Sequence, residues 1–347
     1  MIRGKILVTG AGGFNGRHLV ELLKAEGYEV RATDLPAGER TSSPEFFKDL
    51  QVEFVPSDLT DPSTLDDALA DIDCVMHLAS LFDYSAPLEL NREINVEGTR
   101  NLCEAARRAG IRKFILWSTL GVYGVQKEMP VTEESPPNPG NNYEISKLEQ
   151  EQTVLEYYRD GHFGVTVMRP APVYGAGNRY GFINLIKLIT FPPRVPVLTK
   201  LKSRIPSVNV RDVAGAGIFL LEAPDEKTGG EVFNVIDDTN IPLQDFLHFV
   251  AGLAGKETRI IPFPVNVKLM LAMGHFGAKV NRFVSENFLH GRPLLEDATV
   301  DYLAFNYIYS NEKIKDLGYK FLYPDCRVGL IEMFDWIKEE NLEPLKI

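Results

Sequence analysis

The chain has 347 residues, 44% of them hydrophobic and 24% charged, a composition typical of globular proteins and a length that suggests about two domains. The formal net charge of −11 argues against a nucleic acid as partner, because binding to phosphates requires a basic surface. A membrane span is not expected, since no run of about 18 apolar residues occurs, and the lack of a signal-peptide pattern leads us to expect the cytoplasm.

Short apolar runs alternate with helical segments up to about residue 170. Six runs are predicted strands: KILVTG (5–10), EVRATD (29–34), VEFVPSD (52–58), CVMHLAS (74–80), KFILWST (113–119) and GVTVMRP (164–170). Their near-continuous apolar character indicates strands buried on both faces, as in a parallel sheet with helical crossovers. The sequence therefore predicts an α/β fold with a doubly wound parallel sheet (a Rossmann fold), in which residues 1–170 form the dinucleotide-binding core.

Beyond residue 170 the pattern becomes irregular. Residues 205–237 are expected to return to the sheet, while 171–204 and 238–347 form a smaller, interleaved substrate-binding region. The amphipathic stretch 263–280 is compatible with a membrane-surface helix or with the apolar wall of a substrate pocket. Only Lys268 and Lys279 are cationic in it, which favours the pocket wall.

The three cysteines, Cys74, Cys103 and Cys326, are far apart and form no CxxC pair. Neither a disulfide framework nor a zinc site is suggested, so we expect reduced packing residues and no metal.

The first strand runs directly into a glycine-rich turn, ILVTGAGGFNG, with Gly10, Gly13 and Gly16 at GxxGxxG spacing. Glycines there allow a tight turn and a close backbone approach, so that a pyrophosphate can bind the amide groups at a helix N-terminus. Asn15 occupies a position where an apolar residue would pack better. The turn predicts a dinucleotide site.

Asp34 closes the second strand, where a carboxylate can accept hydrogen bonds from both ribose hydroxyls and would repel a 2′-phosphate. This favours NAD over NADP, although the nearby Arg31 and Arg40 could neutralise a 2′-phosphate and so leave NADP as an alternative. Asp58, at the end of the third strand, is a candidate for the adenine amino group or for capping a helix.

Tyr143 and Lys147 are four residues apart in NNYEISKLEQE, inside a helical pattern that runs to about Arg159. On a helix they share one face, where a lysine cation would lower the pKa of the tyrosine and make the phenol a usable general acid and base. Two other pairs with this spacing, Tyr123/Lys127 and Tyr309/Lys313, lie in a loop and across a predicted helix start.

Seven motifs, in order and spacing, resemble the extended short-chain dehydrogenase/reductase family, also called the NAD-dependent epimerase/dehydratase family. They are TGAGGFNG, SDL, VMHLAS, NVEGTRNL, WSTLGVYG, YEISKLEQE and RPAPVYGAG. The resemblance implies that Thr119 joins Tyr143 and Lys147 as a catalytic group and that Asn95 stabilises the active-site helix. It also implies a homodimer through helices near 88–109 and 142–159. The further cofactor contacts that it implies are Phe14, Asn15, Leu59, Leu78, Ala79 and Pro170.

The tail, with its LGY motif and late Trp-containing helix at about 290–340, looks like the 3β-hydroxysteroid dehydrogenase branch, and Pro172 lacks the amide that nucleotide-sugar enzymes of the family use there. We therefore expect an NAD-dependent oxidoreductase acting on an apolar, steroid-like or acyl-chain alcohol or ketone. A nucleotide-sugar 4-epimerase or 4,6-dehydratase is the alternative within the fold, and a non-catalytic dinucleotide sensor is the alternative from another class. His77 is expected to be a satisfied core imidazole rather than a base.

Overall fold

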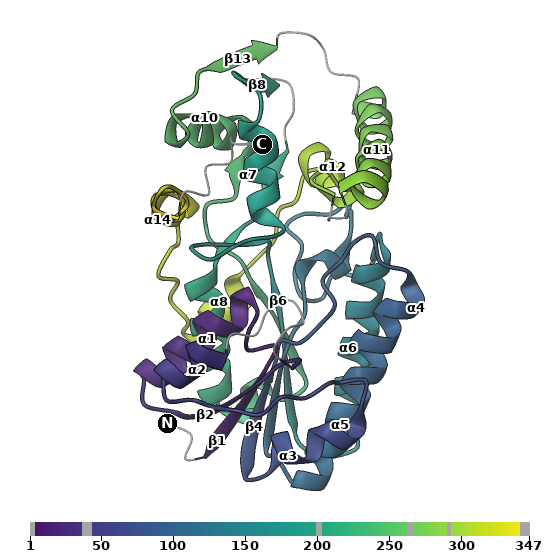
Figure 1. The fold of residues 1–347 in the computed structure, drawn as a ribbon, viewed down its shortest axis with the longest axis vertical. Coiled ribbons are helices and arrows are strands. Elements are labelled where there is room, and N and C mark those ends of the chain that lie inside the picture. The colour runs from purple at the N-terminus through teal and green to yellow at the C-terminus, as the bar shows by residue number, and fades with distance from the viewer. Residues whose placement is uncertain (1–3, 37–43, 199–202, 262–266, 290–292, 341–347) are drawn as a thin grey trace.

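The computed structural model describes residues 4–36, 44–198, 203–261, 267–289 and 293–340. Its centre is a seven-stranded parallel sheet in the order β11-β6-β5-β4-β1-β2-β3 (Figure 1). The strands are β1 (Lys5–Thr9), β2 (Glu29–Thr33), β3 (Glu53–Phe54), β4 (Ile72–His77), β5 (Lys113–Trp117), β6 (Gly164–Pro170) and β11 (Glu231–Val235). The predicted doubly wound α/β fold is confirmed, and the strand order reverses between β1 and β4, where such folds bind ligands.

Helices cover both faces of the sheet (Figure 1). On one face lie α1 (Phe14–Ala25), α2 (Pro44–Asp49) and α8 (Val210–Glu222), and on the other α3 (Leu65–Leu69), α5 (Gly98–Ala109) and α6 (Asn142–Arg159). The connection to α5 passes through α4 (Leu88–Asn91) and a π-helical turn, η2 (Arg92–Glu97). The strands are covered on both sides, and most of their buried side chains are apolar, although Thr9, His77 and Thr166 are buried polar exceptions.

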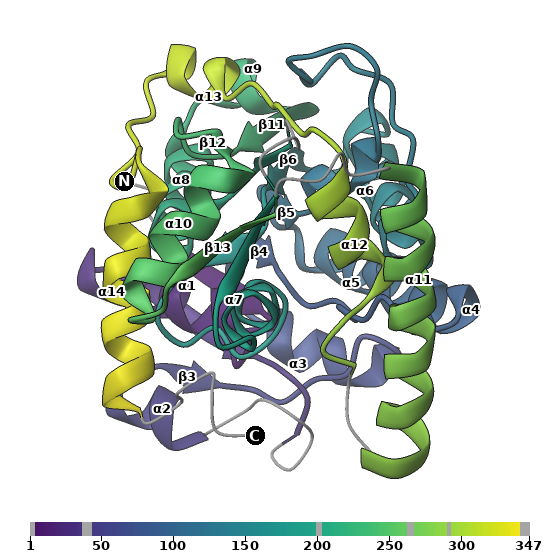
Figure 2. The ribbon, with the colours of Figure 1, turned by 90° about the horizontal axis from the view of Figure 1, so that it is seen from above.

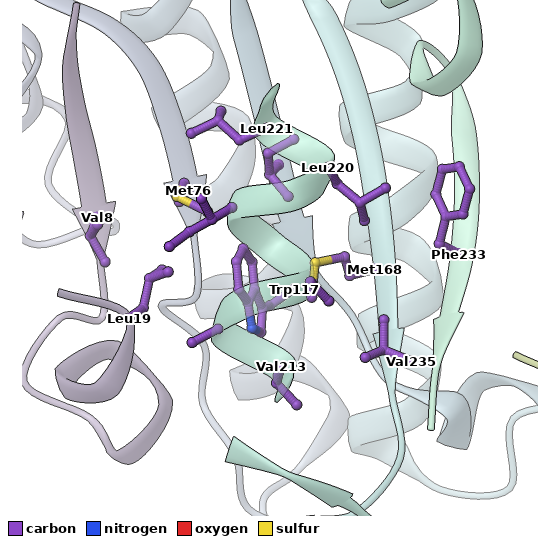
Figure 3. Close-up of a cluster of buried hydrophobic side chains, with 14 of the residues drawn as sticks. Val8, Leu19, Met76, Trp117, Met168, Val213, Leu220, Leu221, Phe233 and Val235 are labelled. Carbon is purple, nitrogen blue, oxygen red and sulfur yellow. The ribbon is translucent and has the colours of Figure 1, made fainter. Parts of the chain in front are cut away.

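The return segment packs α8 closely against the middle strands (Figure 3). A Cβ atom on Gly217 would lie 2.2 Å from the ring of Trp117, so only glycine lets α8 approach that side chain. Met76, Met168 and Val213 fill the surrounding space in the same buried cluster. After α8 and α9 (Asp225–Thr228), β11 pairs in parallel with β6 and extends the sheet.

Most of the remaining chain forms a second hydrophobic core, above the sheet in Figure 1. The elements outside the sheet are β7 (Val173–Tyr174), α7 (Phe182–Thr190), β8 (Val195–Leu198), β9 (Arg204–Ile205), β10 (Val208–Asn209), β12 (Ile241–Pro242), α10 (Leu243–Leu253), β13 (Thr258–Ile261), α13 (Glu312–Leu317) and α14 (Cys326–Glu339), with the 3₁₀ turns η1 (Pro62–Thr64) and η3 (Leu120–Tyr123). The strand pairs β8–β13, β7–β10 and β9–β12 join segments that are distant in the sequence. All three cysteines are buried and free, as predicted.

The segment containing α11 (Val267–Val284), η4 (Ser285–Leu289) and α12 (Asp297–Ala304) lies along one edge of the molecule (Figures 1 and 2). Of the predicted stretch 263–280, residues 263–266 lie outside the described residues, and the rest belongs to α11. Within the described part of the chain, no α11 residue lines the large cavity, so this part of the stretch does not form the expected pocket wall. None of the described helices is long and apolar enough to cross a membrane.

Candidate active site

A cavity of about 1570 Å³ opens at the carboxyl ends of the central strands. Residues that follow β1, β2, β4, β5 and β6 line it, together with α6 and parts of the second core. The predicted site residues in its wall are Gly10, Gly13, Phe14, Asn15, Gly16, Asp34, Asp58, Leu59, Leu78, Ala79, Thr119, Tyr143, Lys147 and Pro170. The predicted site residue Asn95 does not belong to this lining.

The glycine-rich turn is shaped by close backbone contacts. Gly10 has a φ of +64°, and a Cβ atom there would lie 2.7 Å from the amide nitrogen of Ala79. A Cβ on Gly16 would lie 2.2 Å from the carbonyl oxygen of Gly10. Gly13 is the N-cap of α1, so the amide end of a 12-residue helix adjoins the cavity. This arrangement fits a pyrophosphate, because the unpaired N–H groups of a helix N-terminus attract anions.

Asn15 supports the same assignment. It lines the cavity, and its buried Oδ1 has no hydrogen-bond partner among the described residues. Buried polar atoms are rarely left unsatisfied, so a polar ligand group fits here.

Asp34 has a structural role that the sequence did not reveal. Its Oδ2 accepts a hydrogen bond from the amide of Gly12, and its Oδ1 accepts one from the amide of Leu35, both at 2.8 Å. Burial raises the pKa of this carboxyl. Asp34 therefore fixes the glycine-rich turn while remaining in the cavity wall, where each oxygen can accept a further bond.

The direction of Arg31 is now defined. Its side chain is buried, forms an ion pair with Glu53 at 2.9 Å and donates to the carbonyl oxygens of Asp67 and Ala68. Arg31 does not line the cavity, so it is not placed to neutralise a 2′-phosphate. Arg40 lies outside the described residues.

Asp58 caps a turn and lines the cavity at the same time. Its Oδ1 accepts hydrogen bonds from the amide and hydroxyl of Thr60, at 2.8 and 2.7 Å. The 3₁₀ turn that follows is capped by Asp61 instead, so Asp58 is not a helix cap as the alternative interpretation supposed.

Tyr143 and Lys147 both line the cavity from the first turns of α6. The helix begins there because the side chain of its N-cap, Asn141, accepts a hydrogen bond from the amide of Glu144 at 3.0 Å. Lys147 is 2% exposed and donates from Nζ to the carbonyl oxygen of Trp117 at 2.7 Å and to Oε1 of Gln150. Strand β5 and helix α6 thus each supply one hydrogen-bond acceptor that fixes the position of the Lys147 ammonium group.

The protein by itself does not lower the pKa of Tyr143, contrary to the expectation from the lysine spacing. Burial raises the pKa of Tyr143, and the neighbouring Glu144 raises it further, while a hydrogen bond with Ser80 opposes this. Burial also lowers the pKa of Lys147 to about 7. Desolvation disfavours the charged form of both groups, and it outweighs the effect of the four-residue spacing.

A buried hydrogen-bond chain connects Lys147 to the glycine-rich turn. From Gln150 it passes through Thr99 (2.7 Å) and His77 (2.8 Å) to the hydroxyl of Thr9 (2.7 Å). Burial lowers the pKa of His77 to about 3, so the imidazole is neutral and satisfied within the core, as expected. The sequence predicted neither Gln150 nor this chain, because its members come from four separate segments.

Thr119 shares the cavity wall with Tyr143, whereas Asn95 lies behind the wall and anchors the helix that carries Tyr143. The Oγ1 of Thr119 accepts from the amide of Gly121 at 3.1 Å, which leaves its hydroxyl proton available toward the cavity. Asn95 is fully buried and joins the loop after β4 to α6, accepting from the amide of Leu81 (2.6 Å) and donating to Ser146 (2.9 Å).

Sequence reasoning missed two serines of the cavity wall, Ser80 and Ser118. Ser80 interacts with the hydroxyl of Tyr143, and the buried Oγ of Ser118 has no partner among the described residues. Both lie at the carboxyl ends of predicted strands, 74–80 and 113–119, and that position was the signal available in the sequence.

Aromatic side chains pack around the ring of Tyr143 in the cavity wall. The ring centroid of Phe82 lies 5.0 Å from that of Tyr143 and 5.1 Å from that of Tyr180, and the ring centroid of Tyr84 lies 5.6 Å from that of Tyr143. Phe82, Tyr84 and Tyr180, here called the aromatic wall, all line the cavity. Sequence reasoning also missed this wall.

The sequence matches the model of the NAD dependent epimerase/dehydratase family over residues 6–235, which spans the whole sheet. The chain belongs to this family. Its predicted enzyme class and its predicted cofactor, NAD, are thereby confirmed.

Individual relatives carry different activities. The chain is 28% identical over 272 residues to N-acetyl-alpha-D-glucosaminyl-diphospho-ditrans,octacis-undecaprenol 4-epimerase of Escherichia coli O157:H7, covering 76% of each protein. It is 24% identical to 3-beta-hydroxysteroid dehydrogenase of Mycolicibacterium neoaurum, over 98% of this chain and 95% of the relative. The structure of the UDP-glucose 4-epimerase of Thermus thermophilus with NAD shares the fold, with a TM-score of 0.72, 24% identity and coverage of 96% of this chain and 99% of that one.

Proposed function

We propose that this protein transfers a hydride between NAD and the secondary alcohol or ketone of an apolar, steroid-like or acyl-chain substrate. The observation that carries the proposal is the aromatic wall, which places Phe82, Tyr84 and Tyr180 around Tyr143 in the cavity. Aromatic surfaces recognise apolar molecules through burial of non-polar area.

The residues of the glycine-rich turn would hold the cofactor, with Asp34 at the adenosine ribose and Lys147 at the nicotinamide ribose. When bound, NAD supplies the hydride acceptor and a positively charged ring. Burial lowers the pKa of Lys147, and a hydrogen bond from Lys147 to the ribose would hold it beside Tyr143.

Tyr143 would act as general acid in ketone reduction. Burial favours the neutral phenol, so the proton is on the oxygen that must donate it as negative charge develops on the substrate. Thr119 would donate a hydrogen bond to the same substrate oxygen. In the oxidative direction Tyr143 would accept the proton of the alcohol.

A nucleotide-sugar epimerase or dehydratase is the second candidate, supported by the relatives that carry such activities. The cavity offers this substrate little charge complementarity. The basic side chains in the described lining are Arg17 and His18 of α1, Lys147, which is assigned to the nicotinamide ribose, and Arg179, which forms an ion pair with Glu340 at 3.7 Å. The lining also contains Pro172 where such enzymes use an amide.

A non-catalytic NAD sensor is the third candidate. Such a protein has no need of Thr119, Tyr143 and Lys147, yet all three lie in the cavity wall. Their common placement favours catalysis.

One experiment separates the three candidates. The protein is incubated with NAD and a panel of hydroxysteroids, long-chain secondary alcohols and UDP-sugars, while reduced nicotinamide is followed by absorbance and sugars by chromatography. Net NADH formation with apolar alcohols supports the proposal. Interconversion of UDP-sugars without net NADH supports the second candidate, and NAD binding without any turnover supports the third.

We also propose a homodimer in the cytoplasm. Ion pairs between Arg92 and Glu149 (2.6 Å) and between Arg100 and Glu156 (3.4 Å) connect η2 and α5 with α6 across an exposed two-helix surface.

Three free, buried cysteines support a reducing compartment. A mass of 38.9 kDa in light scattering at micromolar concentration would contradict the dimer.

A further inference from the structure

The side-chain amide of Gln150, fully buried in α6, is hydrogen-bonded at both ends. Its Oε1 accepts from the Nζ of Lys147, and its Nε2 donates to the Oγ1 of Thr99 at 2.7 Å. The same Nε2 lies 3.3 Å from the Nε2 of His77. The amide therefore faces an amine on one side and two neutral groups on the other, and all four side chains are buried.

The far end of this buried chain determines the direction of its hydrogen bonds. The Oγ1 of Thr9 accepts from the amides of Leu78 and Ala79, both at 3.2 Å. A hydroxyl has two acceptor positions, so its proton is left for the Nδ1 of His77 at 2.7 Å. Because burial lowers the pKa of this imidazole to about 3, the ring is neutral and carries its own proton on Nε2, which donates to Thr99 at 2.8 Å.

This direction leaves one favourable orientation for the amide of Gln150. The Oγ1 of Thr99 already accepts the proton of His77, and the Nε2 of Gln150 fills its second acceptor position. If the oxygen and nitrogen of the amide exchanged places, the N–H groups of Gln150 would face the N–H groups of Lys147. The chain thus presents the amide oxygen of Gln150 to the lysine.

The consequence for Lys147 is a fixed ammonium group. A charged lysine has three N–H donors, and the protein binds two of them, through the carbonyl oxygen of Trp117 and the Oε1 of Gln150. Among the described residues, this leaves the third N–H for a ligand, since Lys147 lines the cavity. Both acceptors favour the charged form of the lysine, whereas burial lowers its pKa.

The other titratable groups around Lys147 do not replace Gln150. Glu151, on the next turn of α6, also favours the charged lysine, but its carboxylate is held in a bidentate ion pair with an arginine of β6. Burial lowers the pKa of His77 and raises that of Tyr143, so both are neutral. Gln150 is therefore the side chain that binds the ammonium group directly.

We propose that Gln150 is a positioning residue, which fixes the ammonium group of Lys147 through its amide oxygen and leaves one N–H for the nicotinamide ribose. The bond to the ribose rests on the proposed function. The fixed ammonium group does not, because its partners belong to the protein and it needs neither NAD nor substrate.

The test follows the charge of Lys147 in the protein without NAD. Isotope-labelled lysine is observed at Cε by NMR as the pH is varied, and the resonance that is missing from Lys147→Met identifies Lys147. We expect Gln150→Met, which is similar in size but has no amide, to lower the midpoint of this titration by about one to two pH units. Gln150→Glu should raise the midpoint, because a carboxylate beside a cation favours the charged form, and this variant keeps the test decisive if Gln150→Met does not fold.

Thr153→Val is the matched control. It removes another hydrogen bond of α6, from the buried Thr153 to the carbonyl oxygen of Glu149 at 3.0 Å, and should leave the midpoint unchanged. Isothermal titration of NAD tests the bond to the ribose: Gln150→Met should bind NAD about tenfold more weakly, and Gln150→Glu should recover most of the affinity.

The outcomes separate this proposal from the proposed function. Displaced midpoints and a changed NAD affinity in a protein that oxidises no alcohol would support the positioning role and remove the proposed function. Equal midpoints in the wild type and both Gln150 variants, an equal displacement in Thr153→Val, or unchanged NAD affinity in Gln150→Met would overturn the positioning role.

Discussion

The Nζ atom of Lys147 lies 2.7 Å from the carbonyl oxygen of Trp117, the last residue of β5. Its second partner is Gln150, one turn further along α6. The lysine is therefore positioned by the strand and by its own helix, independently of the hydroxyl of Tyr143. Removing that hydroxyl should leave the lysine in place.

We expect Tyr143→Phe to lower kcat by about 10²–10⁴, the usual value of general acid–base catalysis, with little change in NAD affinity. The ring remains packed against Phe82 and Tyr84, and Lys147 keeps both of its partners. Steady-state kinetics with an active substrate and a fluorescence titration of NAD check the two parts.

Tyr123→Phe is the matched control, because Tyr123 also begins a Tyr-x-x-x-Lys pair and is also buried. Its hydroxyl donates to Asn234 at 2.9 Å, outside the cavity. Losing that bond should cost about 1–3 kcal/mol of stability but leave kcat near the wild-type value. Tyr309→Phe should likewise retain activity, and comparable losses of kcat in all three variants would contradict the role of Tyr143.

Glu144 should make the protein less stable as pH rises from about 4.5 to 7. Burial raises the pKa of this carboxyl from 4.5 to about 7, with nearby Asp301 also raising it and hydrogen bonds from Gly140 and Asn141 opposing. In this interval the folded state holds a proton that the unfolded state releases, so stability falls with increasing pH. Glu144→Gln should show a smaller decrease of the melting temperature over the same interval, and an unchanged pH profile would refute the assignment.

Gly16→Ala should abolish NAD binding and lower stability, because the new Cβ would lie 2.2 Å from the carbonyl oxygen of Gly10 and force the turn to move. Gly252→Ala is the control, since nothing lies within 4 Å of a Cβ at that helical position. It should be neutral or slightly stabilising. Isothermal titration of NAD and thermal unfolding of both variants decide the matter, and full NAD affinity in Gly16→Ala would count against the turn as the pyrophosphate site.

The sequence predicted those site residues that lie close to one another along the chain. The glycine-rich turn, Asp34 and the Tyr143–Lys147 pair each lie within one strand–turn–helix segment, so spacing alone placed them on the cavity wall. The partners of Lys147 and the aromatic wall come from segments that only the folded chain brings together. The rotation of α11 could not be predicted either, because hydrophobic periodicity gives the apolar side of a helix but not whether protein or solvent faces it.

Asp34 allows a test of cofactor choice that does not require the substrate. Its carboxylate lies in the cavity wall and binds the amides of Gly12 and Leu35, so a 2′-phosphate brought beside it would meet a negative charge. Arg31 does not offset this charge, because it is paired with Glu53 away from the cavity. NAD should therefore bind much more tightly than NADP.

Asp34→Asn, which removes the charge and keeps one acceptor oxygen, should reduce the ratio of the two dissociation constants about tenfold or more, since one charge contact is worth at least about 1.4 kcal/mol at such a site. Asp58→Asn is the matched control, a second carboxylate of the cavity wall that caps a turn and should leave the ratio unchanged. Similar affinities for NAD and NADP in the wild type, or equal ratios in the two variants, would show that Asp34 does not contact the ribose.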